Sequence, residues 1–241
     1  MLEAPPTVTD TELLISVPDQ PEHIETRAML LRGTAHIFGQ DSHHCVLCNK
    51  QTSLITTFGH PPTTAISEAI QCYPEAETLI TSPALQEQLT AILEGWDCHP
   101  AVVHVLDASS PLPPPAYDCR WLHPDVIQNM ANVSDQVRND LWVATFRSRI
   151  VTALADGQPA AFCFASSYTD SWWNVSVETL ERYRRKGFAT ACVAWMTARF
   201  AKRNMQPVWV ADKSNEASLA MSSHLGFKPV GELIVFRRLI I

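Results

Sequence analysis

A short basic segment, residues 184–189, constrains the fold of this chain more than any other feature; it reads Arg-Arg-Lys-Gly-Phe-Ala. It follows a strand-like run from Trp172 to Thr179 and opens a helical pattern that extends from Gly187 to about Asn204. The first turn of a helix has backbone N–H groups without an intrahelical partner, and the helix dipole makes that end partly positive. The segment therefore predicts a strand, a phosphate-binding loop and a helix in that order. The alternative interpretation is a basic turn before an amphipathic helix.

The residue types in this loop suit a bound phosphate group. Gly187 lets the main chain approach a ligand, and Ala189 keeps the next turn small. Arg184, Arg185 and Lys186 add positive charge, and a guanidinium group can bind two phosphate oxygens at once. The spacing is neither that of a dinucleotide-binding fingerprint nor that of a Walker loop.

The pattern Arg-x-x-Gly-x-Ala, preceded by Val-Glu-Thr and by Tyr183, resembles the pyrophosphate loop of the GNAT superfamily of acyl-CoA-dependent N-acetyltransferases. A second stretch strengthens this resemblance. Asn215-Glu216-Ala217-Ser218, followed by His224-Leu225-Gly226-Phe227, is similar to the family's Asn-x-x-Ala/Ser helix that ends in Gly-Phe. The resemblance covers about residues 145 to 238 and implies an α/β (α+β) fold, in which helices flank a mixed central sheet.

The resemblance also implies which residues bind acetyl-CoA, the acyl donor of the family. The main chain of Val177 and Thr179 lies where the family's strand pairs with the pantetheine amides. Asn215 and Ser218 would face the pantetheine arm near the thioester. The loop residues expected to hold the pyrophosphate are Arg184, Arg185, Lys186, Gly187, Phe188, Ala189 and Thr190.

Acyl transfer to an amine needs a base, a donor for the developing oxyanion and an acid for the leaving thiolate. Glu178 is the candidate base, because family members often place a carboxylate on this strand; the alternative is a solvated strand residue. A strand N–H in the range 177–179 is the candidate donor. Many relatives carry a Tyr acid seven residues after the helix Asn, but this chain has Ser222 there, and a Ser hydroxyl is a far weaker acid. Tyr168 and Tyr183 are alternatives for the acid.

Residues 1–115 are expected to form a smaller N-terminal α/β domain. A helix near Pro21 to Ile37 is followed by a hairpin from Cys45 to Phe58, and then by the order helix, strand, helix, strand. This order is close to that of the second half, but Gly59-His60-Pro61-Pro62 stands where a phosphate loop would be. We therefore hypothesise that this half is a degenerate GNAT-like copy that does not bind CoA.

The Pro-rich stretch from Ser109 to Pro115 marks the expected boundary with a GNAT acetyltransferase domain over residues 116–241. Clustered prolines do not enter a helix or the interior of a sheet, so they favour a semi-rigid linker. The alternative is a surface loop within one domain.

Composition limits the kind of partner. The chain has a net charge of -7, whereas nucleic acid and anionic membranes require a basic face, so neither is expected as a partner. The first 30 residues contain no sustained apolar run, which argues against a signal peptide or a membrane span and favours a cytoplasmic protein. Nothing in the sequence indicates the oligomeric state.

Seven cysteines are scattered along the chain, an odd number that does not suggest a disulfide framework. The segment His43-His44-Cys45-Val46-Leu47-Cys48 has ligand types and a spacing that zinc favours, but a second Cys-x-x-Cys is missing. The same cysteines also fit the interior of a strand. We therefore expect no metal.

The function indicated by these features is N-acetyltransferase activity, in which an acetyl group moves directly from acetyl-CoA to a primary amine. The acceptor is a small molecule or a peptide whose identity the sequence does not show. Trp142, Trp172 and Trp173 are candidates for an acceptor pocket, although tryptophans in this pattern are more often packed in the core. The alternative function is a non-catalytic acyl-CoA-binding sensor or scaffold, suggested by Ser222 and by the degenerate first half.

Overall fold

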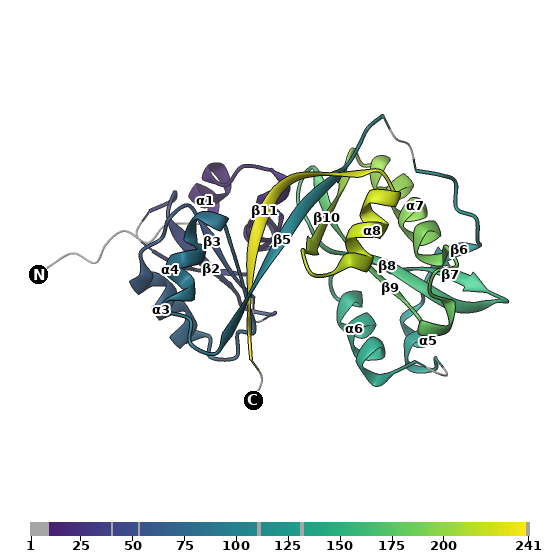
Figure 1. The fold of residues 1–241 in the computed structure, drawn as a ribbon, viewed down its shortest axis with the longest axis horizontal. Helices are drawn as coiled ribbons and strands as arrows, with labels where there is room; N and C mark the ends of the chain where they lie inside the picture. Colours follow the sequence, from purple (N-terminus) through teal and green to yellow (C-terminus); the bar gives the residue numbers. More distant parts are fainter. Residues whose placement is uncertain (1–9, 40, 53, 110–111, 131–132, 240–241) are drawn as a thin grey trace, which may run out of the picture. The chain divides into compact units, whose positions relative to one another are not determined.

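The computed structural model describes residues 10–39, 41–52, 54–109, 112–130 and 133–239 (Figure 1). Short 3₁₀ turns lie at Pro21–His23, Pro83–Leu85 and Glu181–Tyr183. The other elements are, in chain order, α1 (Asp10–Ser16), α2 (Ile24–Leu31), β1 (Ala35–Phe38), β2 (Cys45–Asn49), β3 (Leu54–Phe58), α3 (Thr63–Cys72), β4 (Thr78–Thr81), α4 (Gln86–Thr90), β5 (Trp96–Leu106), β6 (Cys119–Trp121), α5 (Pro124–Gln128), α6 (Asp135–Thr145), β7 (Val151–Ala155), β8 (Gln158–Tyr168), β9 (Trp172–Thr179), α7 (Phe188–Ala201), β10 (Gln206–Asp212), α8 (Glu216–His224) and β11 (Phe227–Arg238).

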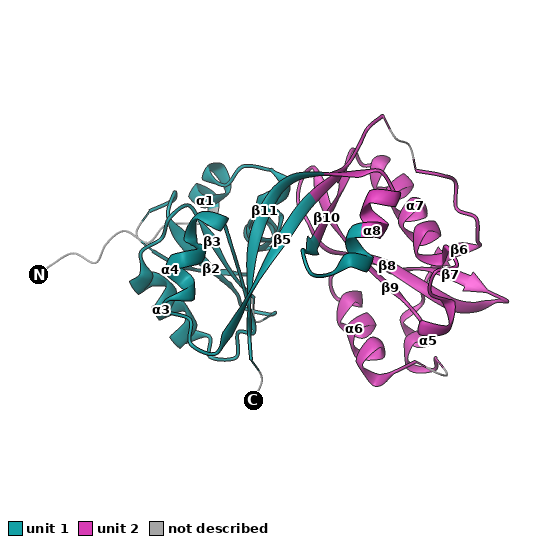
Figure 2. Cartoon of the chain, viewed as in Figure 1, with its two compact units in different colours: residues 1–103, 211–219, 229–241 teal, residues 104–210, 220–228 magenta. Residues whose placement is uncertain are grey.

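The chain divides into two compact units, neither of which is continuous in sequence (Figure 2). The first unit comprises residues 1–103, 211–219 and 229–241, and the second comprises residues 104–210 and 220–228. The first unit thus takes in most of the C-terminal strand, β11. Two separate domains with a boundary at residue 115 stay a prediction. Within the Pro-rich stretch, Ser110 and Pro111 lie outside the described residues.

In the first unit the strand order is β1-β2-β3-β4-β11-β5. The pairs β1–β2, β2–β3 and β4–β11 are antiparallel, whereas β3 and β4 are parallel and are joined through α3. Strand β2 is buried on both faces. Val46 and Cys48 belong to the core formed with α3 and α4, and Cys45 and Leu47 to the core formed with α1 and α2. The hairpin expected from Cys45 to Phe58 is confirmed, and its cysteines are strand interior.

The helix expected from Pro21 to Ile37 is wrong in its second half. Helix α2 ends at Leu31, and strand β1 begins at Ala35. Gly33 adopts a φ of 62°, and its N–H donates to the carbonyl of Leu30 (3.1 Å). A left-handed glycine directly after a helix closes the last turn and turns the chain away, so the helix cannot continue.

In the second unit the strand order is β10-β9-β8-β7-β6. The pairs β6–β7, β7–β8 and β8–β9 are antiparallel, and β9 and β10 are parallel and joined through α7. Helix α7 covers one face of this sheet, and α5 and α6 lie on the other (Figure 1). On the α7 side the Cys192 thiol donates to the carbonyl of Ala161 (3.4 Å), and on the opposite side Phe162 packs with Ile127 and Leu141.

The predicted α/β fold, with a mixed sheet flanked by helices, is confirmed in both units. The strand expected from Trp172 to Thr179 has those bounds, and the helix expected from Gly187 to about Asn204 runs from Phe188 to Ala201. No helix within the described part of the chain is long and apolar enough to cross a membrane.

Candidate functional site

The two parallel strands of the second unit separate before they end. Residues Trp172–Asn174 of β9 pair with Gln206–Val208 of β10, and the pairing stops there. The rest of β9, Val175–Thr179, pairs with β8 alone among the described strands. One edge of β9 is thereby open toward the loop that follows it.

The direction of the main-chain groups along this segment follows from one hydrogen bond. The N–H of Leu180 donates to the carbonyl of Ala160, which belongs to β8 (3.0 Å). The main-chain groups of Leu180 therefore face β8. Because successive residues of a strand direct their main-chain groups to opposite edges, those of Val177 and Thr179 face away from β8. These are the two residues that the sequence predicts to pair with a pantetheine arm. The open edge of β9 thus fits that expectation.

The basic loop ends in two left-handed residues. Arg185 has a φ of 59° and Gly187 a φ of 85°, and Gly187 is the N-cap of α7. The helix has no side-chain cap, and a hydrogen bond from the Ala191 N–H to the Gly187 carbonyl closes its first turn (3.1 Å). The N–H groups of Phe188, Ala189 and Thr190 are therefore the uncapped first turn, next to the side chains of residues 184–186. This arrangement suits an anionic ligand.

Tyr117 holds the loop in place and was not predicted from the sequence. Its hydroxyl donates to the carbonyl of Lys186 (2.6 Å), and its ring stacks on Phe188 with 4.0 Å between ring centroids. Phe188 is buried, so one end of the stack is fixed in the core of the unit. A Cβ added to Gly187 would contact only the Tyr117 ring, at 3.7 Å, which is an ordinary van der Waals distance.

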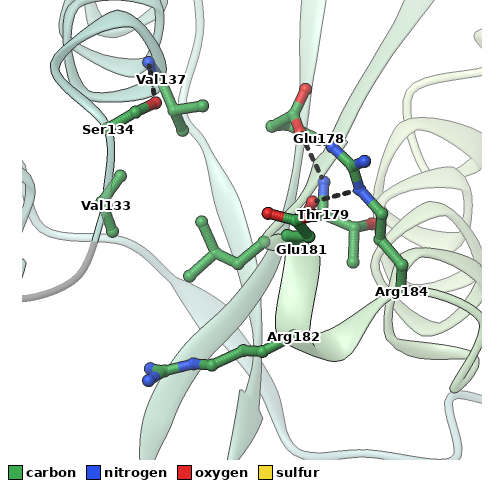
Figure 3. A pocket seen from close by; sticks show the side chains of 9 residues that line it. Val133, Ser134, Val137, Glu178, Thr179, Glu181, Arg182 and Arg184 are labelled. Atoms are coloured by element: carbon green, nitrogen blue, oxygen red, sulfur yellow. Dashed lines mark hydrogen bonds and ion pairs between the residues drawn. The ribbon is translucent and has the colours of Figure 1, made fainter.

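Glu178 and Arg184 engage the main chain of Thr179 (Figure 3). The Thr179 N–H donates to Glu178 Oε1 (3.2 Å), and Arg184 Nε donates to the Thr179 carbonyl (3.4 Å). The two side chains lie 4.0 Å apart and are 42% and 62% exposed, so their ion pair is weak. A ligand that paired with Thr179 would compete with both side chains. Glu178 would then be released toward the neighbouring cavity.

Glu178 lines two cavities on the side of the sheet that faces α6. One has a volume of about 560 Å³ and lies between Val133, Ser134 and Val137 on one side and Glu178 and Arg184 on the other (Figure 3). The second has a volume of about 350 Å³ and is lined by side chains of α6 and by residues 176–178 of β9. The carboxylate thus stands where a small solute can reach it. The interpretation of Glu178 as a residue that faces only bulk solvent is less consistent with this position.

The residues predicted on α8 are placed differently from the loop. The side-chain carbonyl of Asn215 accepts the N–H of Ser218 (3.0 Å) and so caps the start of α8. Ser222 is completely buried. The roles expected for Asn215 and Ser218 in binding the pantetheine arm and for Ser222 as the acid stay predictions.

The tryptophans considered for an acceptor pocket have separate environments. Trp173 is fully buried and stacks on Phe200, with 4.7 Å between the rings, which makes it a core residue. Trp142 is 37% exposed on α6 and meets the ring of Phe146 edge-on. Trp172 starts β9 and is half-buried.

Cys45 and Cys48, which the sequence offers as possible zinc ligands, are unreactive thiols. Burial raises the pKa of the Cys45 and Cys48 thiols to about 12 each, so both stay protonated at neutral pH. Across the described residues, no group of three or more His, Cys, Asp or Glu side chains is arranged to hold a metal ion.

Comparison with known proteins finds a family match within the second half of the chain. Residues 149–236 match the family model described as GNAT acetyltransferase. No curated protein matches the sequence significantly. The matched segment contains β9, the basic loop and α7, which are the elements that build the candidate site.

Solved structures resemble the chain over nearly its whole length. A GCN5-related N-acetyltransferase-like protein from Streptococcus suis is 17% identical, with a TM-score of 0.69, over 95% of this chain and 99% of the other. A GCN5-related N-acetyltransferase from Kribbella flavida is 14% identical, with a TM-score of 0.60, over 90% and 93%. A tandem GNAT protein from the clavulanic acid biosynthesis pathway, solved without AcCoA, is 13% identical, with a TM-score of 0.57, over 96% and 94%.

At these identities the likeness establishes the fold alone. The likeness to a tandem GNAT protein covers both halves of the chain, which agrees with the hypothesis that the first half is a GNAT-like copy. The chain therefore has the fold of the GNAT proteins, and its residues 149–236 carry the sequence match to the GNAT acetyltransferase family.

Proposed function

We propose that this protein is an N-acetyltransferase that moves an acetyl group from acetyl-CoA to the primary amine of a small molecule or a peptide. The observation that carries the proposal is the separation of β9 from β10 directly before an uncapped helix. The open strand edge offers main-chain groups to the pantetheine amides, and the helix offers N–H groups to the pyrophosphate. The GNAT family match over the same residues supports this assignment.

The residues present fit acetyl-CoA at this site. The N–H groups of residues 188–190 would bind the pyrophosphate, and Arg184, Arg185 and Lys186 would offset its charge. Above Gly187 the structure leaves room, since an added Cβ there meets only Tyr117. The main chain of Val177 and Thr179 would hold the pantetheine arm. When bound, acetyl-CoA supplies the activated acyl group.

Glu178 is proposed as the base. A primary amine is protonated at neutral pH and cannot attack a carbonyl carbon until it loses a proton. The Glu178 carboxylate can accept that proton, which leaves a neutral amine and a carboxylic acid, and the acid returns the proton to water through the cavity that Glu178 lines. Main-chain N–H groups at the open edge of β9 are the proposed donors to the carbonyl oxygen that gains negative charge.

A non-catalytic acyl-CoA-binding module is the second candidate, and the burial of Ser222 favours it. Family members often carry a tyrosine at this position as the acid for the leaving thiolate, whereas the Ser222 hydroxyl is both a weak acid and fully buried. Without an acid from this residue, Tyr168, Tyr183 or water protonates the thiolate, or the thiolate leaves unassisted.

The test is release of free CoA thiol in the presence of a panel of primary amines, which includes polyamines, amino acids and peptides with free N-termini. The proposal expects thiol release with at least one amine, and the acetylated amine in the mass spectrum. Binding of acetyl-CoA without transfer across the panel would support the sensor or scaffold. Failure to bind acetyl-CoA at all would overturn both candidates.

A further inference from the structure

A third cavity in the second unit, with a volume of about 560 Å³, is lined by four arginines. Arg147 and Arg149 come from the segment between α6 and β7, and Arg199 and Arg203 from the end of α7 and just beyond it. Trp121 of β6 and Tyr168 of β8 also line it. This concentration of positive charge occurs in a chain whose net charge is -7.

The cavity is separate from the proposed acyl-CoA site. Helix α7 begins at the basic loop and has 14 residues, which corresponds to a length of about 20 Å. Arg199 is in the last turn of this helix and Arg203 follows it. The cavity therefore lies at the opposite end of α7 from the basic loop. It shares no lining residue with the larger cavity beside Glu178, and it shares only Arg147 with the smaller one.

Aromatic rings orient two of the guanidinium groups. Arg149 lies over the ring of Trp121 at 4.2 Å, and Arg199 lies over the ring of Trp195 at 3.9 Å. The two indole rings themselves meet edge to face, with 4.8 Å between centroids. A guanidinium that stacks on a ring uses its flat face for that contact, so the N–H groups in its plane stay available to a ligand.

These N–H groups have no protein acceptor in the part of the chain that the structure describes. Arg184 and Arg237, by contrast, each lie near a carboxylate. The dipole of α7 accounts for cations at its C-terminal end, but it does not account for Arg147 and Arg149, which come from another segment. Like charges that converge without acidic partners repel one another, and a bound anion would offset this repulsion.

We infer that this cavity binds a small polyvalent phosphate anion, either free or as the phosphate moiety of an organic molecule. A carboxylate has two oxygens and satisfies a single guanidinium fork, whereas a diphosphate presents several pairs of oxygens and up to four negative charges. Four guanidinium groups from two separate segments match the second kind of ligand. The cavity is large enough to hold it.

The experiment is calorimetric titration of inorganic pyrophosphate into the full-length protein. The test variant is the double substitution Arg147→Gln and Arg149→Gln, and the charge-matched control is Arg120→Gln with Lys202→Gln, two exposed cations that do not line the cavity. We expect pyrophosphate to bind the wild type and the control equally. The titrations are repeated in the Gly187→Trp background, which blocks binding at the basic loop. There the cavity should bind pyrophosphate as before, and the test variant should bind it at least tenfold more weakly.

Two further titrations distinguish the classes of anion that the cavity could bind. A further variant serves as a control for a folding defect. Citrate tests a polyvalent carboxylate, and a nucleoside diphosphate tests an organic phosphate; the inference expects weaker binding of citrate than of either phosphate. Arg203→Gln, an exposed position, serves if the double variant fails to show a native unfolding transition. Absence of pyrophosphate binding, equal loss in the control pair, or loss in Gly187→Trp alone would each overturn the inference, whatever the outcome for acetyl transfer.

Discussion

Two strand–loop–helix–strand connections in this molecule share a topology, but the residues in and around their loops differ. In the first unit β3 pairs in parallel with β4 over Leu54–Thr56, and in the second β9 pairs in parallel with β10 over Trp172–Asn174. Each pair is joined through a loop and a helix, and each loop contains a left-handed glycine. The φ values are 64° at Gly59 and 85° at Gly187.

The surroundings of the two glycines are opposite. A Cβ on Gly59 would collide with the carbonyl oxygen of His43, and the N–H of His60 already donates to His44 Nδ1 (2.9 Å). The segment before β2 thus occupies the space above this loop. Among the described residues, a Cβ on Gly187 would meet only the ring of Tyr117, at 3.7 Å. The left-handed glycine therefore lies in a tightly packed loop in the first unit and in an accessible loop in the second.

The two loops also differ in charge and in N–H groups. Residues 59–62 read Gly-His-Pro-Pro, and Pro62 is the N-cap of α3. Proline has no N–H, and this loop contains no arginine or lysine. The second loop combines three cations with an uncapped helix. A left-handed glycine after a strand is thus not sufficient to identify a phosphate site, and the neighbouring residues decide.

The largest expected effect is on catalysis. The end of β9 carries Glu178, whereas the end of β3 carries Thr57 and Phe58. Glu178→Gln removes the proposed base and keeps the size of the side chain, so we expect kcat for acetyl transfer to fall by about 10²- to 10⁴-fold. The KM for acetyl-CoA should stay within about twofold, because a base acts after binding.

The matched control for this substitution is Glu87→Gln, which removes the same charge from an exposed position on α4. It should leave kcat unchanged. A Glu178→Gln variant with the full rate of the wild type would show that Glu178 is not the base.

The next largest effect concerns stability. Alanine at Gly59 combines a strained left-handed conformation with a backbone collision, so Gly59→Ala should lower the free energy of unfolding by about 3 kcal/mol. Gly187→Ala meets only the conformational strain and should cost about 1 kcal/mol. Urea denaturation of the two variants measures the difference. Equal losses would mean that the two loops are packed alike.

The smallest expected effect is on the affinity for acetyl-CoA when the contact between Tyr117 and the basic loop is weakened. Tyr117→Phe keeps the stack on Phe188 and removes the hydrogen bond to the Lys186 carbonyl. A hydrogen bond of this kind contributes about 1 kcal/mol, so we expect the Kd for acetyl-CoA to rise about fivefold. Calorimetry at constant ionic strength measures it, and an unchanged Kd would show that Tyr117 does not shape the binding conformation.

The sequence predicts the second unit well because its elements are long and have clear ends. The side chains of the eight residues of β9 alternate between the two faces of the sheet, and polar turns lie on both sides of the strand. Helix α7 is long and apolar and follows a glycine. The first unit is harder to predict. The left-handed conformation of Gly33 ends α2 inside the helix expected from Pro21 to Ile37, so the sequence does not predict β1.

Contacts between distant residues explain the parts of the site that the sequence does not reveal. Tyr117 follows a Pro-rich stretch that looks like a linker, yet its hydroxyl bonds to a residue 69 positions later. The four arginines that line the third cavity come from two separate segments, so no local pattern groups them. The burial of Ser222 likewise depends on packing around α8 rather than on its motif.

Calorimetric titration of acetyl-CoA into the wild type and into Gly187→Trp tests the contrast between the two loops most directly. The account predicts that acetyl-CoA binds at the second loop of the wild type and that this site is lost in the variant, because the indole would fill the space above the loop. A wild type that does not bind acetyl-CoA, or unchanged binding in Gly187→Trp, would contradict the account.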